Sequence, residues 1–170
     1  MNQGNELQSP KPWWRIPLGI FSGLGALAFT LAGILTLAFN LLGEEGTFQP
    51  DSFHVTNTWL TIHLLAEILS GLAGGLVARW VGGNWSVWVL SSLLFVLGAA
   101  GSWEKIREEN QDQVRQAGQI TSLDASNVAI SPDWKHAITP FSLAGMALVA
   151  GWLVNRGSKT AQTPEGPSSA

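Results

Sequence analysis

The amino-acid sequence predicts an all-α integral membrane protein in which four transmembrane helices form an antiparallel bundle. Only 12% of the 170 residues are charged and 46% are hydrophobic, whereas a soluble domain carries about 25% charged residues. A helix needs about 20 apolar residues to cross a hydrocarbon layer of about 30 Å. Four stretches meet this requirement within a membrane domain over residues 13–156, namely residues 16–42, 58–79, 85–103 and 137–154.

The first span, residues 16–42, contains no charged residue. The apolar core of a signal peptide has about 7 to 15 residues and is followed by a small-residue cleavage site. This run is much longer and ends at Asn40, Gly43 and Glu44, so we expect no cleaved signal peptide. Residues 1–12 are polar, contain two prolines and show no periodicity, which indicates a disordered tail.

The second span, residues 58–79, follows Thr56 and Asn57, either of which can cap a helix N-terminus. Only a short glycine-rich turn separates it from the span at 85–103, so these two helices should be antiparallel neighbours. Residues 104–117 contain no Pro or Gly and precede Gly118, a natural helix C-cap. We therefore expect the third helix to extend into the outer aqueous phase.

The fourth span, residues 137–154, is preceded by Ser131, Pro132 and Asp133, which suit a helix N-cap, first position and first turn. Pro140 lies inside this span and lacks the N–H that would bond the carbonyl of His136, so a kink or a helix restart is expected there. Residues 157–170 have the composition of a disordered tail.

The charges of the connecting segments predict the orientation. The side with both termini and Arg79 carries five Lys or Arg and two Glu, while the other side carries four Lys or Arg and nine carboxylates. Since Lys and Arg resist translocation, we expect a cell-membrane protein with both termini in the cytoplasm. Indole rings prefer the membrane interface, and the nine tryptophans fall near predicted span ends: Trp13, Trp14, Trp80, Trp85, Trp88 and Trp152 inside, and Trp59, Trp103 and Trp134 outside.

Small residues recur at four-residue spacing along the first and second spans. This spacing places them on one helix face, where they let neighbouring helices approach closely. The same faces would serve association with a second copy or with other membrane proteins. The expected packing positions are Gly19 and Gly23 in the first span and Ser70, Gly71, Gly74, Gly75 and Ala78 in the second.

Glu67 is the only carboxylate within the second span, and His63 lies four residues before it on the same face. Glu67 follows Leu60 by seven residues, which places it about 10 Å inside the boundary, too deep for so short a side chain to reach the headgroups. Polar residues of the other spans at similar depth include Thr36, Ser102 and Ser142. The candidate polar site comprises His63, Glu67, Asn40, His136 and Thr139.

These residues leave three functional interpretations open. The sequence favours a structural or accessory membrane protein without a cofactor, in which Glu67 bonds His63 and Asn40 to hold the helices together. The alternative is a proton, ion or small-solute transport element centred on Glu67, because intramembrane carboxylates are costly and often functional. A second alternative is an electron carrier that binds metal or haem through His63 and His136.

Other classes find little support in the sequence. There is no Cys, which excludes thiolate metal sites and cysteine nucleophiles. The spans contain no Ser-His-Asp arrangement, carboxylate pair or phosphate-binding loop, so we expect no enzyme. The net charge of -3 does not favour nucleic acid as a partner, and the partner that the sequence does imply is the lipid bilayer.

Overall fold

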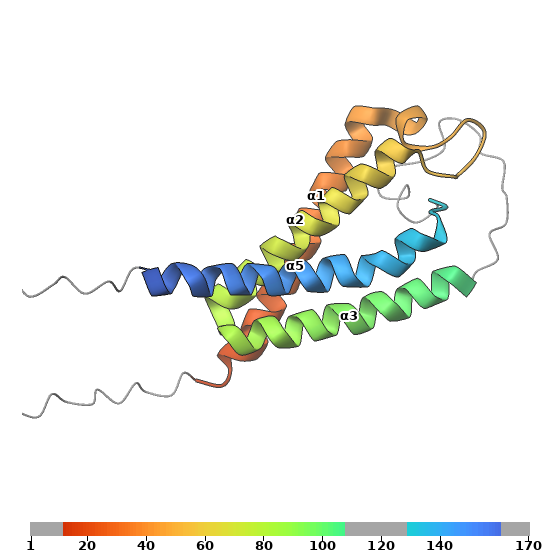
Figure 1. The fold of residues 1–170 in the computed structure, drawn as a ribbon. Coiled ribbons are helices and arrows are strands. Elements are labelled where there is room, and N and C mark those ends of the chain that lie inside the picture. Colours follow the sequence, from red (N-terminus) through yellow and green to blue (C-terminus); the bar gives the residue numbers. More distant parts are fainter. Residues whose placement is uncertain (1–11, 108–128, 161–170) are drawn as a thin grey trace, which may run out of the picture.

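The computed structural model describes residues 12–107 and 129–160, in which the long elements are four helices. Each helix is long and apolar enough to cross a membrane, and the four pack together (Figure 1). The predicted all-helical fold with four candidate membrane spans is therefore confirmed. The helices are α1 (Arg15–Thr47), α2 (Asn57–Gly82), α3 (Asn84–Arg107) and α5 (Asp133–Thr160).

Glycines mark the ends of the first two helices. α1 is longer than the expected span of 16–42, but its backbone leaves helical geometry at Gly43, with φ 67° and ψ -176°, and the chain bends there (Figure 1). α2 begins after Thr56, whose hydroxyl accepts a hydrogen bond from the Trp59 N–H at 3.2 Å. Gly83 alone separates α2 from α3, and its φ of 88° suits a residue without a Cβ.

α3 and α5 both extend beyond the expected spans. α3 continues past residue 103 to Arg107, while the rest of the expected extension and its cap at Gly118 lie outside the described residues. α5 begins at Asp133, where Ser131, Pro132 and Asp133 indicated a helix start, runs through Pro140, and ends at Thr160, so the helix contains the expected span of 137–154. The expected tails are described only at Pro12 and at residues 157–160, which belong to α5.

The antiparallel pair α1 and α2 meets through glycine. A Cβ built on Gly23 would lie 2.8 Å from the carbonyl oxygen of Gly74, and one built on Gly74 would lie 2.9 Å from that of Gly23. No side chain larger than hydrogen fits between the two backbones at this crossing. Helix backbones approach this closely only where small residues face each other.

α5 packs against both α2 and α3. Gly71 of α2 faces the carbonyl of Leu143, and four residues later Gly75 faces Ala147, so α2 and α5 run parallel. On its other side α5 is antiparallel to α3, because the Ser91 hydroxyl donates to the carbonyl of Ala144 at 2.7 Å, whereas Gly98 lies against Pro140.

The connector between α1 and α2 folds over the end of these two helices at which α2 begins. Phe48 and Val55 form an antiparallel bridge, and His54 forms a parallel bridge with Ile130 just before α5. Beneath the connector, Trp59 is only 2% exposed and packs edge-to-face on Phe39. Trp59 is therefore a core residue of the bundle rather than an exposed interfacial one, unlike the other eight tryptophans, which are exposed.

Candidate functional site

Glu67 lies at the contact between α2 and α5, where its side chain is only 2% exposed. The Thr139 hydroxyl donates to Oε1 at 3.0 Å, and the Ser142 hydroxyl donates to Oε2 at 2.9 Å. Both donors come from α5. Each oxygen of the buried carboxylate thus has a hydrogen-bond partner on the neighbouring helix, as a buried polar group requires.

His63 lies one turn before Glu67 on α2, with Nδ1 3.1 Å from Oε1. The distance suits an ion pair, but the ring nitrogen is not aligned for a hydrogen bond and makes none with any described residue. The imidazole also contacts the ring of Trp59 edge-to-face, with centroids 6.4 Å apart. Trp59, His63 and Glu67 thus follow one another at four-residue spacing along one face of α2.

Lys135 carries a positive charge on the α5 side, and its electrostatic interaction with Glu67 is attractive. Lys135, Thr139 and Ser142 are spaced by four and three residues, which places them on one face of α5. The face of α5 turned toward Glu67 is therefore polar over two turns, although most of the helix is apolar.

The two hydroxyls have a second acceptor within reach. Thr139 Oγ1 lies 3.1 Å from the carbonyl oxygen of Lys135, and Ser142 Oγ lies 2.9 Å from that of Thr139. A hydroxyl has one proton, so it donates to one acceptor at a time. Both hydroxyls can donate to ionised Glu67, whereas protonated Glu67 can donate to Ser142 Oγ while that hydroxyl turns to its own helix.

Of the candidate residues from the sequence, the structure brings His63, Glu67 and Thr139 together. Asn40 is exposed on α1, and the hydrogen-bond partners of Glu67 come from α5 instead. His136 is half-buried on α5 and is not among the hydrogen-bonding or ionic partners of Glu67. The expected bond from Asn40 to Glu67 is thus absent from the described part of the chain.

Ser142 and Lys135 complete the site without having been in the candidate set. Ser142 was expected at the same depth, and its position three residues after Thr139 is the signal that places both on one face. Lys135 had been assigned to the outer connector, but it lies in the first turn of α5. The helix start expected at Ser131, Pro132 and Asp133 agrees with this position, and only the membrane span was expected to begin later, near residue 137.

The described residues contain no group of three or more His, Asp or Glu placed to hold a metal ion. The histidines proposed as haem or metal ligands, His63 and His136, lie on α2 and α5 respectively. No family model, curated protein or solved structure matches the chain.

Proposed function

We propose that this chain is a structural or accessory membrane protein in which Glu67 joins α2 to α5. The observation that carries the proposal is the pair of hydrogen bonds from Thr139 and Ser142 to the two carboxylate oxygens. A carboxylate within a membrane costs a few kcal/mol. His63 lies on the same helix as Glu67, but Thr139, Ser142 and Lys135 offset that cost only when α5 is in its observed position.

The glycine contacts support the same role for this helix pair. Beyond Glu67, α2 meets α5 again at Gly71 and Gly75, where the backbones touch. Glycine contacts allow close approach but discriminate poorly between registers that differ by one turn, because small residues recur every four positions. A carboxylate matched to two hydroxyls at one level selects a single register.

Glu67→Leu and Glu67→Gln test this role. Leu removes both hydrogen bonds between the helices and leaves His63 and Lys135 without their carboxylate, so the free energy of unfolding should fall by about 1 to 3 kcal/mol. Gln retains an acceptor oxygen and similar size, so its effect should be smaller. The measurement is thermal or denaturant unfolding of the detergent-purified chain.

A double-mutant cycle isolates the contact itself. Thr139→Val with Ser142→Ala should destabilise the wild-type chain but should add little in the Glu67→Leu background, since the bonds are already lost there. Full additivity of the two changes would show that the hydroxyls act independently of Glu67. It would overturn the proposal that Glu67 joins α2 to α5 through these hydroxyls.

The paired acceptors of Thr139 and Ser142 favour a second candidate, proton transfer through Glu67. Each hydroxyl can turn between the carboxylate and a helix carbonyl, so the site keeps its hydrogen bonds in either protonation state. Proton flux measured in proteoliposomes should then be lost in Glu67→Gln while the variant still folds. Absence of flux with wild-type protein argues against this candidate, and flux that persists in Glu67→Gln excludes Glu67 as the carrier.

A further inference from the structure

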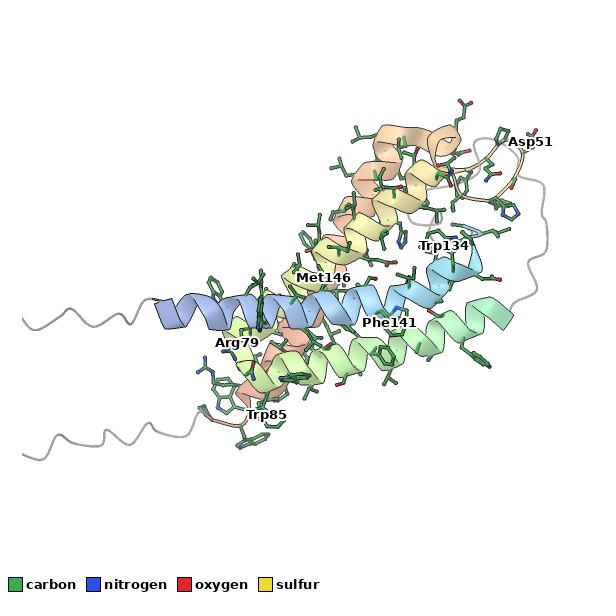
Figure 2. The ribbon with its side chains drawn as sticks, in the orientation of Figure 1. Asp51, Arg79, Trp85, Trp134, Phe141 and Met146 are labelled. Carbon is green, nitrogen blue, oxygen red and sulfur yellow. The ribbon has the colours of Figure 1, made fainter. Side chains whose placement is uncertain are left out.

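A cavity of about 470 Å³ lies at the end of the bundle where α1 begins and α2 turns into α3. Arg15, the first residue of α1, and Arg79, in the last turn of α2, both line it. Trp80 and Trp85 line it as well. Figure 2 shows Arg79 and Trp85 together at this end, remote from Asp51 at the opposite end of the bundle.

Tight backbone packing fixes the two arginine positions relative to each other. A Cβ built on Gly19 would lie 2.6 Å from the Cα of Gly82, so the first turns of α1 lie directly against the end of α2. The Ser86 hydroxyl of α3 donates to the carbonyl of Ile16 at 3.2 Å. Three helices therefore hold the walls of the cavity before any ligand binds.

The charge of the cavity suits an anion. Its described lining includes two guanidinium groups and no Asp or Glu. A guanidinium presents a planar set of donors that matches phosphate oxygens in pairs. Asn84, the first residue of the 24-residue helix α3, also lines the cavity, and a helix N-terminus contributes unpaired N–H groups and a partial positive charge.

The surrounding tryptophans identify the depth of the cavity in the membrane. Trp80 is 85% exposed and Trp85 is 73% exposed, at the ends of helices apolar enough to span a bilayer. Exposed indoles at such positions lie at the level of the lipid headgroups. Phosphate esters are the anions concentrated at that level, and basic pockets between transmembrane helices are known to bind them.

We propose that Arg15 and Arg79 form a binding site for the phosphate of an anionic phospholipid headgroup. The acyl chains of such a lipid extend along the apolar outer surface of the helices while the headgroup enters the cavity. This site lies at the C-terminal end of α2, about three turns beyond Glu67, and does not depend on the function proposed for that residue.

The test uses the full-length chain in detergent. It is titrated with dioctanoyl phosphatidylglycerol, dioctanoyl phosphatidylcholine or inorganic phosphate. Native mass spectrometry counts the bound lipid, and thermal unfolding measures the stability. Phosphatidylglycerol should bind saturably and raise the unfolding temperature, and phosphatidylcholine should bind much more weakly. Equal binding of the two lipids overturns the proposal. Stabilisation by inorganic phosphate equal to that by phosphatidylglycerol assigns the site to a free anion and overturns the lipid assignment.

Arg15→Gln and Arg79→Gln should each lower the affinity for phosphatidylglycerol by about tenfold or more, the loss of one charge-assisted contact. Lys105→Gln is the matched control, because it removes one positive charge at the far end of α3, and it should leave the affinity unchanged. Equal weakening by the control overturns the proposal in favour of a diffuse charge effect. If Arg79→Gln does not fold, Arg79→Lys replaces it, because lysine keeps the charge but not the paired donors. Arg15→Gln and Arg79→Lys should then each lower the affinity, while Lys105→Gln should not.

Discussion

Two buried serines differ in their hydrogen bonding, so replacing each of them tests how much a hydroxyl contributes to stability. Ser91 donates to the carbonyl of Ala144 across the contact of α3 with α5. Ser70 is equally buried, yet its hydroxyl has no partner among the described residues. A buried hydroxyl without a partner loses its hydrogen bonds to solvent, and no hydrogen bond in the folded state offsets that desolvation cost.

Ser91→Ala should therefore lower the free energy of unfolding by about 1 kcal/mol, while Ser70→Ala should leave it unchanged or raise it. Both changes remove one oxygen from a fully packed helix contact, so each serves as the control for the other. Thermal unfolding of the two variants in detergent gives the comparison. A larger loss in Ser70→Ala would show that its hydroxyl has a partner after all.

Local spacing explains which parts of the Glu67 site were predictable. His63 and Glu67 are four residues apart on one helix, so their proximity follows from helix geometry alone. The partners on α5 are 72 and 75 positions away along the chain, and depth in the membrane is the only sequence property that relates them. Depth does not specify the direction in which a residue points around its helix axis. Asn40 was therefore included in the candidate polar site although it is exposed.

At the level of elements, α2 is the helix that holds the bundle together. Gly74 faces Gly23 on α1, while its neighbour Gly75 faces Ala147 on α5. Adjacent positions point about 100° apart around a helix, so two glycine faces serve two different neighbours. The four-residue repeats in the sequence predicted that these positions pack, but they did not indicate against which helix.

Gly75→Ala and Gly145→Ala separate packing from helix propensity. Alanine favours the helix over glycine by about 1 kcal/mol at any interior position, and a Cβ on Gly145 would meet nothing within 4 Å. A Cβ on Gly75 would overlap the backbone of Ala147. We expect Gly75→Ala to destabilise by about 1 to 3 kcal/mol and Gly145→Ala to be neutral or stabilising.

Leu76→Ala completes that series, because Leu76 is 43% exposed on the outer surface of α2 and should tolerate truncation better than Gly75 tolerates an added methyl group. The measurement is the unfolding midpoint of each variant in one detergent. Equal effects of all three changes would contradict the close contact of α2 with α5.

Element boundaries were predictable where glycine or a capping residue marks them, and less so elsewhere. Gly43 and Gly83 lie at a bend and a turn that require positive φ, and Thr56 caps α2 as its side chain allows. Ser131 and Pro132 likewise indicated the start of α5 at Asp133, whereas hydropathy alone placed the span only from about residue 137, because the first turns of the helix are polar and carry Lys135.

At the scale of the whole molecule, the sequence predicted four spans but not their order in space. Short connectors make consecutive helices antiparallel, which α1 with α2 satisfies. The parallel contact of α2 with α5 joins segments separated by α3, and no connector length specifies it. Hydropathy cannot specify it either, because each span is apolar over most of its surface and lacks a single buried stripe.

The beginning of α1 and the later part of α5 lie at the same end of the bundle, where Arg15 and Val154 line one cavity, and the distribution of charge predicts on which side of the membrane that end lies. Arg79 and Trp85 lie at one end of the bundle and Asp51 at the other (Figure 2). The end with Arg15 and Arg79 is positive on balance, whereas residues 43–56, from the bend in α1 to the start of α2, contain three carboxylates and no Lys or Arg. Since cationic segments remain on the cytoplasmic side, we expect the Gly83 turn to be inside and the connector at Gly43 outside.

Fusions of a reporter that is active only outside the cytoplasm test this orientation. Fusions after Gly43 and Gly118 should be active, and fusions after Gly83 and Lys159 should be silent, with a cytoplasm-specific reporter giving the reverse pattern at the same four positions. A complete inversion would overturn the orientation while leaving the four-span fold intact. Equal activity at Gly43 and Gly83 would instead contradict α2 as a membrane span, because an odd number of crossings must separate those two positions.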